Sequence, residues 1–162
     1  MKMIPSDIMG NISMFSLDAH ISTLKYRLET EEIKLMDVAY LWDIEAESKL
    51  IESFILGLPV PPVYVMKRKS NKYYEVVDGH HRINTIVNFY ANELKLVLDN
   101  KDLNGKTYQT LDDEYKNILS IATLRIWGIR EVDDDALVHE IFRRLNLGST
   151  KRTSKEIKEL LK

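Results

Sequence analysis

The 162-residue sequence predicts an α+β domain in which helices flank a small mixed sheet. In several segments apolar residues recur every three or four positions, as on the buried side of a surface helix. Between these segments lie short runs that alternate apolar and polar residues or are apolar throughout, as strands do. The length suits one cored domain, so we expect a single domain over residues 1–162, with residues 1–16 as a loosely ordered N-terminal segment.

Two helices are predicted in the first third of the chain. Residues 16–32 form the first, with its inner face made by Leu17, Ile21, Leu24 and Leu28. The second ends before Gly57 and carries an apolar stripe of Leu50, Ile51, Phe54 and Ile55. Gly57 suits a left-handed cap, and the prolines at 59, 61 and 62 prevent the helix from continuing.

The middle of the chain predicts a β-hairpin followed by a helix. Residues 63–67 and 73–77 alternate around the polar centre "KSNK", which indicates two antiparallel strands and a short turn. Gly79 ends the second strand. Helical spacing then resumes through Ile83, Ile86, Val87 and Tyr90.

The second half predicts alternating short elements. We expect a short strand at 94–98, a loop at 99–106, a helix at 111–120 and a core strand at 121–129. A further helix at 133–146 begins with three aspartates that can cap it, and it buries Leu137, Ile141 and Leu145. A last helix is expected from Thr153 or Ser154 to the chain end.

Composition limits the possible functions. The net charge is −2, so the chain has no overall positive field, and any DNA contact requires a local basic patch. Cysteine is absent, which excludes disulfides, thiolate metal sites and a cysteine nucleophile. No run approaches the roughly 20 apolar residues of a membrane span, so we expect a cytoplasmic protein without membrane contact.

The stretch "VVDGHHRINTI" places Asp78, Gly79, His80, His81 and Arg82 between a strand and a helix. The start of a helix presents backbone N–H groups and a partial positive charge, which attract anions. The arginine can hold two phosphate oxygens at once, and the imidazoles add donors. The junction therefore predicts a site for a phosphate-bearing ligand.

Other interpretations of the same residues stay open. Asp78 could merely cap the helix, Gly79 supply the turn and the two histidines lie in solvent. Arg82 is expected near the mouth of the turn and partly solvated, but it could instead be tied to a local carboxylate. Zinc binding is disfavoured because adjacent histidines diverge on a helix and no partner has ligand spacing. His81 could act as a general base next to a bound phosphate.

An ordered set of segments resembles the N-terminal domain of GmrSD-type restriction proteins, within the ParB/sulfiredoxin-like superfamily. The segments are "LWD", "KLIESFILGLPVPPVYV", "YYEVVDGHHRINTIVNFY", "LNGKTYQTLDDE" and "IFRRLNLGSTKRTSKEI". The resemblance implies a fold whose Asp-Gly turn holds nucleotide phosphates. Members bind nucleoside triphosphates, and in several their hydrolysis controls a separate DNA-cleaving domain, while related ParB proteins hydrolyse CTP.

The resemblance also implies which residues form the site. The phosphate site would be lined by Asp78, Gly79, His80, His81 and Arg82, with Thr85 one turn further along the helix. Asn146 would approach the phosphates or their magnesium ion, and Gly148 would let the backbone come close. Glu52 matches an acid of the family. Four basic residues, Arg143, Arg144, Lys151 and Arg152, could add phosphate or nucleic-acid contacts. The alternatives are a helix C-terminus at 146–148 and a solvated face for Glu52 and for the four basic residues.

Two departures from the family pattern bear on activity. Asp37 and Val38 stand near the place of a glutamine-arginine pair whose arginine reaches the nucleotide, so one positive ligand is missing. The sequence stops at Lys162, soon after the motif helix. Neither departure removes the expected pocket, but together they leave hydrolysis, and restriction activity by this chain alone, open.

The leading hypothesis is a nucleotide-binding regulatory domain, with nucleoside triphosphatase activity left open. In it, Arg82 holds phosphate, Asp78 shapes the turn and positions metal or water, and His81 is the candidate base; magnesium accompanies the nucleotide. The alternative is a non-enzymatic interaction module of the same fold that binds DNA or a nuclease or other defence protein. A ParB-like nuclease has less support, because no acid cluster shows metal spacing.

Overall fold

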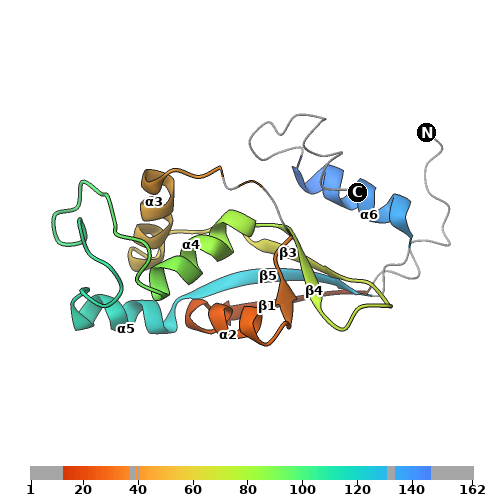
Figure 1. The fold of residues 1–162 in the computed structure, drawn as a ribbon, viewed down its shortest axis with the longest axis horizontal. Coiled ribbons are helices and arrows are strands. Elements are labelled where there is room, and N and C mark those ends of the chain that lie inside the picture. The colour runs from red at the N-terminus through yellow and green to blue at the C-terminus, as the bar shows by residue number, and fades with distance from the viewer. Residues whose placement is uncertain (1–12, 37–38, 40, 131–133, 147–162) are drawn as a thin grey trace.

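The computed structural model describes residues 13–36, 39, 41–130 and 134–146 (Figure 1). In chain order the elements are β1 (Ser13–His20), the 3-10 helix η1 (Ile21–Thr23), α2 (Leu24–Glu29), β2 (Ile33–Lys34), α3 (Ile44–Ile55), β3 (Val63–Lys67), β4 (Tyr74–Asp78), α4 (His80–Tyr90), α5 (Asp113–Ile121), β5 (Thr123–Arg130) and α6 (Asp135–Asn146). The predicted α+β fold class is confirmed.

The strands of this part of the chain form one five-stranded mixed sheet in the order β1-β5-β3-β4-β2. β1 pairs with β5 in antiparallel register along its whole length, and β3 and β4 form the predicted antiparallel hairpin. The pairs β3–β5 and β2–β4 are parallel. Parallel neighbours need a long crossover, which between β3 and β5 runs through β4, α4 and α5. The architecture is consistent with a ParB/sulfiredoxin-like fold.

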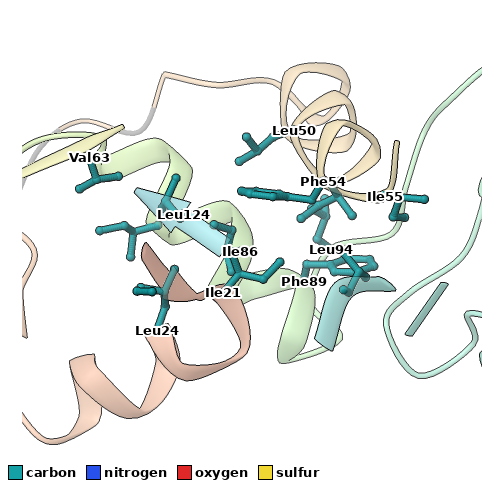
Figure 2. Close-up of a cluster of buried hydrophobic side chains, with 14 of the residues drawn as sticks. Ile21, Leu24, Leu50, Phe54, Ile55, Val63, Ile86, Phe89, Leu94 and Leu124 are labelled. Atoms are coloured by element: carbon teal, nitrogen blue, oxygen red, sulfur yellow. The ribbon is translucent and has the colours of Figure 1, made fainter. Parts of the chain in front are cut away.

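The main core lies between one face of the sheet and helices α2 to α5. Figure 2 shows Leu24, Phe54, Phe89 and Leu124 converging from α2, α3, α4 and β5. Side chains alternate between the two faces of a strand, so Val63 and Val65 join this core while Met66 belongs to the other face. The predicted apolar stripe of α3 is confirmed, as is the left-handed backbone of Gly57, whose φ is +67°.

The opposite face is covered by α6, which Figure 1 shows apart from the other helices. Its apolar side packs on a small second cluster made by Met66, Val77 and Ile129. The members on α6 are the three predicted residues, Leu137, Ile141 and Leu145. Asp134 caps the helix, because its Oδ1 accepts a hydrogen bond of 2.8 Å from the Ala136 amide. Both predictions for this helix are thus confirmed.

The prediction of one helix over residues 16–32 is wrong. Residues 13–20 form β1, and the helical part begins only with η1 and α2. Along β1 the burial alternates, with Phe15, Leu17 and Ala19 on the covered side. Pairing with β5 determines the conformation, so a distant partner overrides the helical spacing. Residues 13–16 are therefore ordered in the sheet, contrary to the expected loose segment, and residues 1–12 lie outside the described residues.

The strand predicted at 94–98 is also not observed. Leu94 and Leu96 are buried, but the backbone of this segment closes on its own loop. The Leu96 amide donates to the Lys106 carbonyl at 2.9 Å, and the Gly105 amide donates to the Leu96 carbonyl at 2.8 Å. The neighbouring predictions, the loop, α5 and β5, are confirmed. The helix expected from Thr153 or Ser154 lies outside the described residues.

The α6 helix carries an ion-pair cluster around Glu140, and it predicts an acid-sensitive stability. Arg143 and Arg144 donate to the Glu140 carboxylate at 2.6 to 2.9 Å and lower its pKa to about 2. A depressed folded-state pKa adds stability above the unfolded pKa, and this stability is lost as the pH falls toward 2. In urea unfolding, the free energy of unfolding of wild type should exceed that of Glu140→Gln at neutral pH. The two values should converge in acid. A difference in free energy of unfolding that does not change with pH would contradict this contribution of the ionised Glu140.

No described helix is long and apolar enough to cross a membrane.

Candidate anion-binding site at the junction of β4 and α4

The junction has the predicted order of strand, glycine turn and helix. β4 ends at Asp78, and α4 begins at His80. Between them Gly79 has φ +105°, a left-handed conformation that glycine adopts without steric cost. A Cβ at this position would lie 2.6 Å from Val63 Cγ2, so a larger residue would also overlap the core. Glycine is therefore required here for its backbone angle and for its size.

Arg82 is held across the turn by two acceptors. Its Nη2 donates to the Pro62 carbonyl at 2.9 Å and to Asp78 Oδ2 at 3.0 Å. Only 15% of the Arg82 side chain and 18% of the Asp78 side chain are exposed. Arg82 thus keeps a small exposed fraction, but most of its guanidinium lies between the end of the proline segment and β4. The arginine is instead tied to a local carboxylate.

Asp78 does not cap the helix. The residue at the cap position is Gly79, which offers no side-chain oxygen, and α4 has no side-chain cap hydrogen bond. The Asp78 carboxylate instead orients the guanidinium four residues later. The interpretation of Asp78 as a simple cap is therefore wrong.

One donor of the Arg82 guanidinium has no partner among the described residues. Within the described part of the chain, Arg82 Nε is buried and has no hydrogen-bond partner. A buried polar group without a partner in a folded protein calls for an explanation, such as a water or ligand atom. Arg82 Nε is therefore the donor at this junction that a water or ligand oxygen would satisfy.

Neither of the two histidines lies fully in solvent. His80 is only 1% exposed and belongs to the protein interior, whereas His81 is half-buried. The His81 ring stacks on Trp42, with ring centroids 5.5 Å apart and planes inclined by 21°. The stack connects the first turn of α4 with the segment that precedes α3, so the orientation of the His81 ring is set by its neighbour.

The remaining predicted site residues are less closely connected to the turn. Thr85 lies on α4 and is fully buried. Glu52 is half-buried on α3, a helix that packs against α4. Asn146 is the last residue of α6, but its side chain, like Gly148, lies outside what the structure describes. The structure thus brings Asp78, Gly79 and Arg82 into contact.

The basic residues expected beside the site have other partners or cannot be placed. Arg143 and Arg144 both pair with Glu140 on their own helix. Lys151 and Arg152 lie outside the described residues. For metal binding, no group of three or more histidine, cysteine, aspartate or glutamate side chains in the described ranges is arranged to hold an ion.

Comparison with known proteins assigns the family. Residues 39–161 match the GmrSD restriction endonuclease, N-terminal domain. The chain belongs to this family. No curated protein and no solved structure matches the chain significantly. The matched range of this GmrSD N-terminal domain includes Trp42, the whole β4–α4 junction and α6, and it begins after β1, α2 and β2.

Sequence reasoning misses two parts of the site in this GmrSD N-terminal domain. Trp42 stands in "LWD", and its contact with His81 joins segments that no local pattern connects. Pro62 acts through its backbone carbonyl, which leaves no side-chain signal. Asp37 and Val38, which stand near the place of the family's glutamine-arginine pair, lie outside the described residues.

Proposed function

We propose that this GmrSD N-terminal domain binds the phosphates of a nucleoside triphosphate at the β4–α4 junction and acts as a regulatory domain. One observation carries the proposal. Arg82 is fixed at the start of α4 by Asp78 and Pro62, while its buried Nε has no hydrogen-bond partner among the described residues. A phosphate oxygen would satisfy this donor with a charge-assisted hydrogen bond.

The local electrostatics support the same ligand. Helix N-termini bind phosphate because their first N–H groups point outward and the helix dipole is positive there. Gly79 lets the strand turn directly into α4. Because Arg82 is already oriented by protein contacts, binding would cost little side-chain entropy. A rigid guanidinium at a helix start therefore favours a small, highly charged anion.

Magnesium would accompany the nucleotide in this proposal. Mg²⁺ prefers oxygen ligands and usually combines one or two carboxylates with phosphate oxygens and water. Asp78 supplies a carboxylate at the junction, but its Oδ2 is engaged by Arg82. We therefore expect the ion to be held mainly by phosphates and water, where it would neutralise charge.

Hydrolysis would assign different roles to Asp78 and His81. Asp78 orients Arg82, so a positioning role suits it better than proton transfer. His81 has a ring fixed by Trp42, which makes it the candidate base for a water beside the phosphates. Phosphate release is the measurement that separates a nucleoside triphosphatase from a binding domain.

A second candidate function is a non-enzymatic interaction module. It is favoured by exposed apolar side chains at both ends of α3, where Leu41, Ile44, Leu56 and Leu58 are all largely solvent-accessible. Contiguous exposed apolar patches mark sites where another protein docks, whereas single exposed apolar residues are common on protein surfaces. A patch at either end of α3 could connect the domain to a nuclease or another defence protein.

The nucleotide proposal predicts a signal from Trp42. In a Trp127→Phe background, which leaves Trp42 as the single tryptophan, each of the four ribonucleoside triphosphates is titrated with magnesium. We expect saturable changes in emission for at least one, because Trp42 stacks on His81 beside the phosphate site. Calorimetry measures the affinity, and a phosphate assay measures turnover.

The control ligand is the matching nucleoside without phosphates, which should give neither heat nor a fluorescence change. If calorimetry detects no binding of any triphosphate, the proposal is rejected and the interaction module is favoured. Binding without phosphate release would assign a switch that does not turn over by itself.

A further inference from the structure

A basic groove lies at the other end of the hairpin, away from the β4–α4 junction. It has a volume of about 520 Å³ and is lined by Lys67, Arg68, Lys69, Lys72, Tyr74 and Arg130, with Asn71 at the turn. Figure 1 shows the β3–β4 turn at the end of the sheet away from α3 and α5. Five-residue strands separate it from Gly79 by roughly 15 Å. The groove is thus a second cationic region, distinct from the proposed nucleotide site.

The sheet register concentrates this charge. Lys67 on β3 is the direct neighbour of Arg130 on β5 in the parallel pair. Like charges on adjacent strands destabilise a sheet, so the arrangement has a cost in the protein alone. An anion placed between the strands would remove that cost. The register therefore places two cationic side chains next to each other at this end of the sheet.

The groove is held in shape by its aromatic and polar residues. The Arg130 guanidinium lies 4.5 Å from the centre of the Phe15 ring, and its Nε donates to the Tyr74 hydroxyl at 3.1 Å. At the turn, the Asn71 amide donates to the Arg68 carbonyl at 3.1 Å. The basic side chains are thus presented by an ordered framework.

Among the described residues, the lining of the groove includes five basic side chains and no acidic one. Glu75 on β4 accepts a hydrogen bond of 3.0 Å from Asn71 Nδ2 and does not line the groove. Glu131 and Asp133 follow Arg130 in the sequence and lie outside the described residues. The groove therefore has a local positive charge in a chain whose net charge is −2.

We propose that this groove, formed by Lys67, Arg68, Lys69, Lys72 and Arg130, binds the sugar-phosphate backbone of a nucleic acid. Duplex DNA carries one negative charge about every 1.7 Å along its axis. A cluster of cations can therefore contact phosphates wherever the protein binds along the duplex. Acidic peptides are less densely and less regularly charged. A groove lined mainly by cationic side chains fits contacts with the phosphate backbone, which position a protein without reading sequence.

The test measures the binding of the full 162-residue chain to labelled duplex DNA, single-stranded DNA and single-stranded RNA of equal length. The variant Lys67→Gln/Lys69→Gln/Lys72→Gln should bind the preferred nucleic acid about 10- to 100-fold more weakly than wild type at low salt. The plot of log binding constant against log salt concentration should also become less steep. Its slope should change by about 0.9 for each duplex phosphate that the variant no longer neutralises. The weakening should be similar for different base sequences.

The matched control is Lys49→Gln/Lys95→Gln/Lys101→Gln, which removes the same charge at exposed positions outside the groove. It should bind as wild type does, and circular dichroism verifies that both triple variants fold. If the groove variant fails to fold, the single variant Lys72→Gln at the exposed turn should still flatten the slope. Equally weakened binding in both triple variants, or tighter binding of polyglutamate than of any nucleic acid, would overturn the proposal.

This inference is independent of the nucleotide proposal. The groove variant Lys67→Gln/Lys69→Gln/Lys72→Gln should leave nucleoside triphosphate binding unchanged, because the groove lies at the opposite end of β4 from Arg82. If the groove variant weakens nucleotide binding as much as nucleic-acid binding, the groove is not a separate site.

Discussion

Arg82→Ala should weaken nucleoside triphosphate binding roughly 30- to 150-fold. An arginine that pairs with phosphate through charge-assisted hydrogen bonds contributes on the order of 2 to 3 kcal/mol. Arg82 is already oriented by Asp78 and Pro62, so most of this interaction would be available on binding. Calorimetric titration with the triphosphate identified by the fluorescence screen measures the change in affinity.

The same substitution should also destabilise the fold. Removing Nη2 leaves the Pro62 carbonyl and the Asp78 carboxylate without a donor in a mostly buried place, at a cost of about 1 to 3 kcal/mol. Affinity must therefore be measured well below the melting temperature of the variant, with unfolding followed separately. A lower affinity among fully folded molecules is the informative result.

Two further variants separate the contribution of Arg82 to nucleotide binding from its contribution to stability. Arg82→Lys keeps the charge without the planar fork, so it should recover only part of the affinity. Arg125→Ala removes a different arginine-aspartate pair, in which Nε and Nη2 bind Asp18 at 2.8 and 2.7 Å. That exposed pair should contribute little to stability and should not affect nucleotide binding. If Arg82→Ala binds nucleotide as tightly as wild type does, the phosphate role is rejected and a structural role remains.

The β4–α4 junction can be predicted because its determinants are local. A strand pattern, a glycine and a resumed helical period lie within a few residues, and the left-handed angle of Gly79 follows from them. The spacing of Asp78 and Arg82 also allows a local ion pair. The Pro62 carbonyl cannot be predicted, because it lies 20 residues before Arg82 and has no side-chain signature.

The conformation of residues 13–20 shows the opposite situation. Leu17 fits both the helical spacing that continues into α2 and the alternation of Phe15, Leu17 and Ala19 along a strand. The choice depends on β5, which is more than a hundred residues away in sequence; for example, Phe15 pairs with Gly128. Gly128 gives the Phe15 ring its space, since a Cβ there would overlap the ring. Local periodicity carries no information about such a partner.

Gly79→Ala should be among the most destabilising single-methyl additions in the described part of the chain, at about 2 to 5 kcal/mol. A non-glycine residue in the left-handed region costs roughly 1 to 2 kcal/mol. Added to this is an overlap with Val63, whose Cγ2 would be 2.6 Å from the new Cβ, and overpacking of a core costs about 1 to 3 kcal/mol. Urea or thermal unfolding of wild type and variant measures the difference.

Gly57→Ala is the matched control, because Gly57 has φ +67° but a Cβ there would have no atom within 4 Å. It should show the backbone cost alone, about 1 to 2 kcal/mol. The additional loss of stability in Gly79→Ala, relative to Gly57→Ala, then measures the overlap with Val63. A substitution of Val63 tests this assignment. In Gly79→Ala/Val63→Ala, the removed Val63 methyls make room for the added one, so the double variant should lose less stability than the two single variants together. Strict additivity, or equal destabilisation at Gly57 and Gly79, would mean that the turn needs glycine for its backbone angle and not for the close contact between β3 and the start of α4.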